Sequence, residues 1–144
     1  KRQIQMFPED APNHVARIKE LVRQGFYDGL KFHRVIDGFM AQTGDPLGNG
    51  TGGSGKNLKA EFNNRPHKRG AVSMARAADP NSADSQFFIC FDDSTFLDRQ
   101  YTVWGQVISG MQAVDKIKRG TGPNGMVYDP DKIISMSVVA DLQK

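Results

Sequence analysis

The sequence predicts a mainly β protein, an antiparallel barrel or sandwich that carries two separated helices. Short segments of alternating polar and apolar residues recur along the 144 residues, and turn-forming residues separate them. Only two segments place apolar residues at helical spacing, and they lie far apart in the chain. Strands and helices do not alternate regularly, which argues against a βαβ fold. Because no repeat or linker divides the chain, residues 1–144 are expected to form a single domain.

The N-terminal region predicts a strand followed by the clearest helix. Lys1–Phe7 alternates as a strand does, and it starts in mid-pattern without a methionine, so the first strand is expected to be truncated. Asp10–Asn13 offers capping side chains and an early proline, which is typical of a helix start. Apolar residues then recur at helical spacing up to Gly25, the expected stop: Val15, Ile18, Leu21 and Val22.

The rest of the chain predicts further strands and one short helix. The Asp37-Gly38 pair predicts a two-residue hairpin turn. Ser109 is expected to cap a helix that Gly120 ends and that carries Met111, Val114 and Ile117. The expected strands are Leu30–Ile36, Phe39–Thr43, Ala71–Ala77, Gln86–Phe91, Thr102–Ile108 and Lys132–Ala140.

Composition excludes several classes of partner. Charged residues make up 24% and apolar residues 38%, as in ordinary globular proteins, and the net charge is only +3. Like charges never form a run, so no nucleic-acid or membrane surface is expected. No segment reaches transmembrane length. The single Cys90 excludes an intrachain disulfide and fits a reducing compartment. A cytoplasmic location is expected, with the periplasm left open because upstream residues are missing from the pattern.

The glycine-rich segment 44–57 imitates two phosphate-binding motifs. Gly48–Gly53 satisfies G-x-G-x-x-G, and Gly50–Lys56 satisfies the first part of a Walker motif. The first motif needs a strand before it and a helix after it, and the second needs Ser or Thr where Asn57 stands. A mobile loop with several positive φ angles is the preferred interpretation.

Other reactive side chains have plain interpretations. His14, His33 and His67 are too scattered to form a local metal set, so each is expected to be structural or solvated and no metal is expected. Cys90 lies in an apolar strand without a neighbouring base, and a packed thiol is expected rather than a nucleophile.

Two apolar segments carry the chemical information. Residues 32–42 place the permanently charged Arg34 among large apolar side chains, with Gln42 close by. Segment 85–91 is strongly apolar and contains no carboxylate or histidine. Such a surface suits binding a neutral apolar group and polarising an amide beside it, rather than proton transfer.

Strand alternation predicts which side chains face the site. Gln86, Phe88 and Cys90 would share one face of a strand, and Phe87, Ile89 and Phe91 the other. A strand buried on both faces is an equally good alternative. In the segment 73–77, Ser73, Ala75 and Ala77 would form a small-residue floor that lets a ligand approach closely, or simply a tightly packed sheet.

Together these segments resemble the cyclophilins, the cyclosporin-binding family of peptidyl-prolyl cis–trans isomerases, in their compact bacterial type. The matching segments lie in family order: 32–42, 49–53, 73–75, 85–89 and 96–98. The resemblance implies a closed eight-stranded antiparallel β-barrel capped by two α-helices, with the active groove on its outer face. It implies an enzyme that speeds rotation about X-Pro bonds and assists protein folding without a cofactor.

The resemblance also assigns residue roles. It implies that Arg34 is the catalytic donor and that Gln42 orients it. The proline pocket would be formed by Phe39, Met40, Phe88 and Leu97. The bound peptide would be bordered by Gly50, Ala75, Arg76, Ala77 and Gln86. Phe96 and Tyr101 stand where animal members carry tryptophan and histidine.

The implied partners are proline-containing peptides and unfolded or folding proteins. Weak cyclosporin binding is expected, because Phe96 lacks the N–H donor and the larger apolar face of an indole. A monomer is expected. Two other classes stay open. A non-catalytic proline-peptide module would not need Arg34 and Gln42 together, and an RNA scaffold would need a basic stripe that the sequence lacks.

Overall fold

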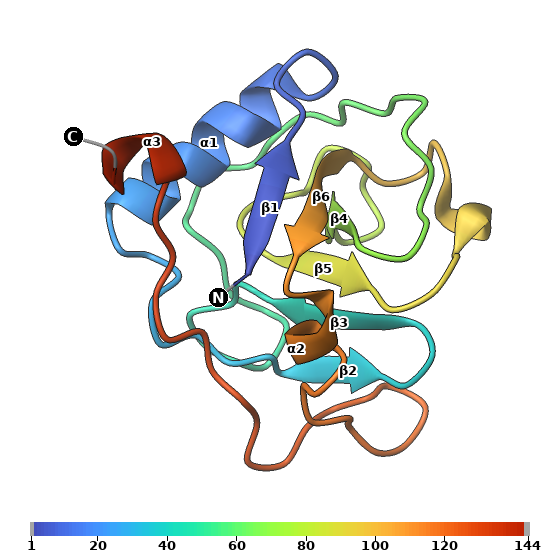
Figure 1. The fold of residues 1–144 in the computed structure, drawn as a ribbon. Coiled ribbons are helices and arrows are strands. Elements are labelled where there is room, and N and C mark those ends of the chain that lie inside the picture. The colour runs from blue at the N-terminus through green and yellow to red at the C-terminus, as the bar shows by residue number, and fades with distance from the viewer. Residues whose placement is uncertain (1, 143–144) are drawn as a thin grey trace.

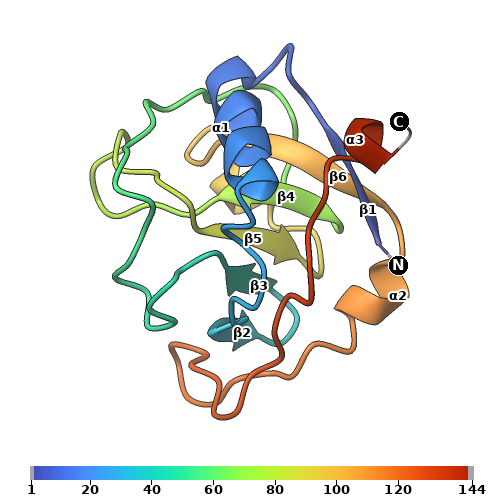
Figure 2. The ribbon, with the colours of Figure 1, turned by 90° about the vertical axis from the view of Figure 1, so that its left-hand side faces the viewer.

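The computed structural model, which describes residues 2–142, is built on one antiparallel sheet with helices around it (Figures 1 and 2). Its strands follow the order β1-β6-β4-β5-β3-β2, so the first strand pairs with the last. The strands are β1 (Gln3–Met6), β2 (Arg34–Ile36), β3 (Met40–Thr43), β4 (Ala71–Met74), β5 (Phe87–Cys90) and β6 (Val103–Ser109). The helices are α1 (Pro12–Arg23), α2 (Met111–Val114) and α3 (Val139–Leu142), with a 3₁₀ turn η1 at Thr95–Leu97.

Strand register places the candidate residues in one row. Arg34 of β2 lies opposite Gln42 of β3, Gln42 opposite Phe88 of β5, and Phe88 opposite Ser73 of β4. Residues directly opposite one another project from the same face of a sheet. The sheet therefore carries Arg34, Gln42, Phe88 and Ser73 side by side on one face, which we call the site face.

The opposite face of the sheet packs against α1 and forms the main core. Val15, Ile18 and Leu21 of α1 are almost fully buried against sheet residues that include Phe87 and Trp104. Helical spacing predicted this face of α1 correctly. The alternation expected along β5 is confirmed, because Phe87, Ile89 and Phe91 belong to the main core while Phe88 and Cys90 form a second cluster on the site face. All four residues of β5 are buried, so the strand is also buried on both faces, as the alternative held.

A distant glutamate caps helix α1. The N-cap position is Ala11 and provides no side-chain bond, so the capping expected from Asp10–Asn13 is wrong. The carboxylate of Glu61 instead accepts the backbone N–H of Asn13 at 3.1 Å and of His14 at 2.8 Å. The first turn of a helix has unpaired N–H groups and favours a negative charge, which Glu61 supplies from 47 residues away.

One turn and one helix differ from the expectation. The loop between β2 and β3 has three residues, because Ile36 pairs with Met40 and the Phe39 N–H donates to the Ile36 carbonyl at 3.0 Å. The second helix is shorter than expected and Ser109 does not cap it. Ser109 ends β6, and Gly110 takes the N-cap position with a φ of 79°.

The last expected strand, Lys132–Ala140, is also wrong. Only Lys132 forms an isolated bridge, with Lys31, and residues 139–142 form helix α3 beside α1, where Arg23 Nε donates to Asp141 at 3.0 Å (Figures 1 and 2). The alternation of apolar residues there reflects packing of an irregular segment, since Ile133, Met136 and Val138 each lie against the main core.

The mainly β antiparallel fold is confirmed, whereas closure of the sheet stays a prediction. Six strands form the ladder in residues 2–142, and none of their pairings joins β1 to β2. The free edge at β2 is covered by the C-terminal segment. There the Val127 N–H donates to the His33 carbonyl, and the Phe32 N–H donates to the Asp131 carbonyl. Within the same residues, no helix has the length and apolarity that a membrane crossing requires.

Candidate active site

An apolar cluster lies on the site face over β3 and β5, and it holds the residues of the expected proline pocket. Met40, Phe88, Cys90 and Ala71 form its buried base. Partly exposed side chains surround that base: Ile36, Phe39, Ala75, Leu97 and Tyr101. The structure thus brings the four residues of the expected proline pocket, Phe39, Met40, Phe88 and Leu97, into one cluster from three separate elements.

A buried histidine supports this pocket from below. The His67 ring stacks on Phe88, with centroids 6.1 Å apart, and its Nε2 lies 2.8 Å from Ser73 Oγ. Its Nδ1 lies 3.0 Å from an Asp98 oxygen, which also accepts the His67 backbone N–H. Burial lowers the pKa of His67, against the opposing effect of Asp98. Sequence reasoning missed this support, because only the fold brings residues 67, 73 and 98 together.

Arg34 lies at one end of the row with its guanidinium held on two sides. Its Nε donates to the Asn124 carbonyl at 2.9 Å, and its Nη1 donates to Gln42 Oε1 at 3.1 Å. Within residues 2–142, Nη2 has no hydrogen-bond partner. Two contacts therefore fix the plane of the guanidinium and leave N–H groups for a ligand. Asn124 was not anticipated, because it contributes a backbone carbonyl and any residue type could do so.

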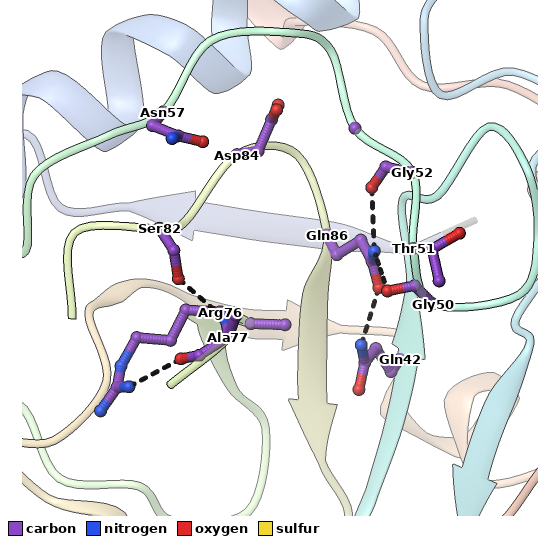
Figure 3. Close-up of a pocket in the computed structure, with 12 residues that line it drawn as sticks. Gln42, Gly50, Thr51, Gly52, Asn57, Arg76, Ala77, Ser82, Asp84 and Gln86 are labelled. Carbon is purple, nitrogen blue, oxygen red and sulfur yellow. Dashed lines mark hydrogen bonds between the residues drawn. The ribbon is translucent and has the colours of Figure 1, made fainter. Parts of the chain in front are cut away.

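A hollow adjoins Gln42, between the glycine loop and the segment after β4 (Figure 3). Its volume is about 280 Å³, and its lining includes Gln42, Gly50, Ala75, Ala77, Ser82 and Gln86. The Gln86 side chain lines the hollow and joins Gln42 to the loop by hydrogen bonds (Figure 3). Ala75 belongs both to this hollow and to the apolar cluster, so the two adjoin.

Arg76 also lines this hollow, and its donor groups are engaged within the protein. Its Nη1 donates to the carbonyls of Ala77 and Ala78, and its Nε and Nη2 donate to the Gln100 carbonyl. Its guanidinium also lies 4.7 Å from the centroid of the Tyr101 ring. Arg76 thus joins two loops beside the hollow, and its expected place at the border of the bound peptide stays a prediction.

Phe96 and Tyr101, which stand where the resemblance places tryptophan and histidine in animal members, have different environments. The Phe96 side chain is 67% exposed and lies against Phe39, with centroids 5.7 Å apart. Tyr101 packs edge-on against Phe88 at 5.9 Å. Tyr101 is therefore part of the pocket wall, whereas Phe96 offers an open aromatic surface at its edge.

The remaining reactive groups are structural. His14, His33 and His67 are each at most 2% exposed, as expected of structural histidines. Cys90 is fully buried under the pocket, and burial raises its pKa to about 12, so a nucleophilic thiolate is disfavoured. Among the side chains of residues 2–142, no three of His, Cys, Asp or Glu converge as a metal site would require.

Comparison with known proteins matches this sequence to one family. A model of the cyclophilin type peptidyl-prolyl cis-trans isomerases covers residues 2–138. A probable peptidyl-prolyl cis-trans isomerase of Brucella suis is 56% identical, over 96% of this chain and 77% of its own length. A peptidyl-prolyl cis-trans isomerase of Helicobacter pylori is 48% identical, over 87% of this chain and 78% of its own.

Solved structures agree with the sequence relatives. A cyclophilin from Hirschia baltica superposes with a TM-score of 0.86 at 32% identity, covering 97% of this chain and 70% of the other. A cyclophilin type isomerase from Cryptosporidium parvum, crystallised in the presence of the dipeptide Ala-Pro, gives a TM-score of 0.84 at 28% identity, covering 93% and 89%.

Proposed function

This chain belongs to the cyclophilin-type peptidyl-prolyl cis–trans isomerases, and from that premise we propose that Arg34 is the group that lowers the rotation barrier. The enzyme catalyses rotation about X-Pro peptide bonds. This rotation normally takes tens of seconds, because twisting the bond sacrifices roughly 18–20 kcal/mol of amide resonance. No covalent bond to the substrate has to form, so neither a nucleophile nor a base is required.

The proposed mechanism divides the work between the two parts of the site. The apolar pocket of Phe39, Met40, Phe88 and Leu97 holds the proline ring and disfavours the charge-separated resonance form of the amide. In the twisted state the lone pair returns to the prolyl nitrogen, where an N–H of Arg34 can donate to it. That hydrogen bond is stronger in the twisted state than in the ground state, which is what accelerates a reaction.

The observation that carries the proposal is the two-sided fixation of Arg34. The Arg34 guanidinium is held by hydrogen bonds from Nε to the Asn124 carbonyl and from Nη1 to Gln42 Oε1. Its remaining N–H donors therefore have a fixed orientation. A donor that is already oriented does not have to reorganise during the reaction. The proposed substrates are proline-containing peptides and folding polypeptide chains, in keeping with the Ala-Pro dipeptide present with the Cryptosporidium parvum relative.

Substitution of Arg34 tests the mechanism. We expect Arg34→Ala to lower kcat/KM for cis–trans exchange by about a hundredfold or more, as the loss of a transition-state donor does. Arg34→Lys should recover little, since an ammonium group lacks the planar fork that Gln42 and Asn124 hold. Exchange of an X-Pro peptide is followed by NMR, and thermal melts confirm that both variants fold. Activity within twofold of the parent in a folded variant would exclude Arg34 as the donor.

A further inference from the structure

The glycine-rich loop 44–57 is organised around a buried carboxylate. Asp45 is only 1% exposed and accepts the backbone N–H groups of Leu47, Asn49 and Gly50 at 2.8, 3.0 and 2.6 Å. Burial alone would raise the pKa of Asp45, but these backbone donors hold the pKa below its usual value. A side chain at Gly52 would collide with Asp45, so glycine is required there for the loop to close. The loop is thus tied in place, unlike the mobile loop that the sequence suggests.

The closed loop presents two carbonyl groups to one side chain. Gln86 Nε2 donates to the Gly50 carbonyl at 3.1 Å and to the Gly52 carbonyl at 3.0 Å. A carbonyl can only accept, so both contacts require the nitrogen of the Gln86 amide. Its oxygen must then face the other way, toward Gln42, as Figure 3 shows.

The orientation of Gln86 sets that of the next amide. Gln86 Oε1 accepts from Gln42 Nε2 at 2.9 Å, which directs Gln42 Oε1 to Arg34 Nη1. A Gln42 amide turned by 180° would place its NH₂ group against the guanidinium, two donors facing one another. Without an acceptor at Gln86, nothing on that side would oppose the turned orientation.

We propose that Gln86, together with the carbonyls of Gly50 and Gly52, is a positioning element that aims Arg34 through the Gln42 amide. The inference rests on the proposed function, because it requires Arg34 to be the catalytic donor. It differs from the role that the resemblance implies for Gln86, at the border of the bound peptide. It also gives the glycine loop a role in catalysis. The Gly50 and Gly52 carbonyls determine which way the side-chain amides of Gln86 and Gln42 are turned.

The first test separates positioning from peptide binding. Gln86→Met keeps the length of the side chain but removes its donor and its acceptor. We expect kcat to fall about tenfold, between the cost of one hydrogen bond and that of a misplaced catalytic group, with KM within about twofold. Because Gln86 acts through Gln42, adding Gln86→Met to Gln42→Met should lower kcat less than twofold further.

Two additional variants complete the test. Gly52→Ala acts on the other end of the chain of contacts, and its loss of kcat should disappear in the Gln86→Met background. The control is Gln106→Met, because Gln106 Nε2 in β6 also donates to two backbone carbonyls, those of Arg69 and Val107, and neither carbonyl belongs to the glycine loop. Gln106→Met should leave kcat unchanged. The ¹H–¹⁵N signal of Arg34 Nε should shift in Gln86→Met and stay in place in Gln106→Met.

The outcomes distinguish the inference from its premise. If Arg34→Ala is inactive but Gln86→Met raises KM alone, or multiplies the loss of Gln42→Met, Gln86 contacts the peptide directly and the inference fails. An unchanged kcat in Gln86→Met also overturns it. Should Gln86→Met not fold, Gly52→Ala alone and combined with Gln42→Met gives the same comparison. If Arg34→Ala remains active, the proposed role of Arg34 as the donor fails, and the premise of this inference fails with it.

Discussion

The two halves of the active site are held in place by different forces. On one side, Arg34, Gln42 and Gln86 are positioned by directed hydrogen bonds of 2.9–3.1 Å, and Arg34 and Gln86 stay partly exposed. On the other side, Met40 and Phe88 are at most 5% exposed and are positioned by packing. Hydrogen bonds fix a direction, which a donor needs, whereas packing fixes a shape, which a ring pocket needs. Substitutions on the hydrogen-bonded side should therefore change catalysis but leave the stability of the fold unchanged. Substitutions on the apolar side should change both.

The largest effect is expected at the base of the apolar pocket. Phe88→Ala should lower the free energy of unfolding by about 3–5 kcal/mol, as removal of a buried phenylalanine does, and should raise KM. Phe87→Ala is the matched control, because Phe87 is equally buried but faces Tyr27 and Trp104 in the main core. It should cost similar stability and leave KM unchanged. Urea titration measures the free energy of unfolding, and peptide exchange measures KM. Equal KM values for Phe88→Ala and Phe87→Ala would show that the apolar half of the site does not hold the proline ring.

A smaller effect is expected at the exposed edge of the pocket. We propose that cyclosporin binds this protein weakly, because Phe96 offers no N–H donor and a smaller face than tryptophan. Phe96→Trp should raise cyclosporin affinity about ten- to a hundredfold, from one hydrogen bond and added buried area. Titration calorimetry on both proteins measures the affinities. Equal values would mean that this position does not set sensitivity to the drug. Turnover of proline peptides should change less, because Phe96 lies outside the buried base.

The smallest effect concerns pH and the histidine beneath Phe88. Burial lowers the pKa of His14, His33 and His67 in the folded protein. Below the unfolded pKa of about 6.5 the unfolded chain therefore binds more protons, and the free energy of unfolding falls as the pH falls. Each histidine that stays neutral contributes up to about 1.4 kcal/mol per pH unit in that window.

Urea titrations at pH 7.5 and 5.5 measure this dependence. His67→Asn should show a smaller loss of stability between the two pH values than the parent protein does. The pKa of Asp98 is also lowered, despite the opposing effect of its desolvation, by hydrogen bonds from His67. Its contribution is lost only when the pH falls below about 4, outside the measured window. An identical loss in His67→Asn would show that His67 does not titrate as its burial implies.

The apolar half was more predictable from sequence than the polar half. Local alternation correctly divided Phe87 from Phe88, and family motifs pointed to Met40 and Leu97, because side-chain direction in a strand depends on nearest neighbours. The contacts of Gln86 with the loop depend on how Asp45 folds the glycines, which no local pattern encodes. Arg76 shows the same limit, since its partner Gln100 is 24 residues away.

Errors in the fold have a similar origin. Glu61 caps α1 across 47 residues, so the side chains next to the helix start were misleading. The alternation in Lys132–Ala140 suggested a strand, but this segment bonds to the chain around Leu30 through single contacts, as when Ile133 donates to the Leu30 carbonyl. A strand needs a partner with a matching free edge, and local sequence does not reveal whether one is available.

The pairing of β1 with β6 has a consequence for synthesis of the chain on the ribosome. Residues 3–6 must wait for residues 105–109 before their backbone groups find partners. At about 5–20 residues per second, that wait is on the order of 5–20 s. During it, β4 also lacks β6 on one side, so an unpaired strand edge is exposed to other nascent chains. An enzyme that catalyses rotation about X-Pro bonds would thus itself depend on protection until its last strand has emerged.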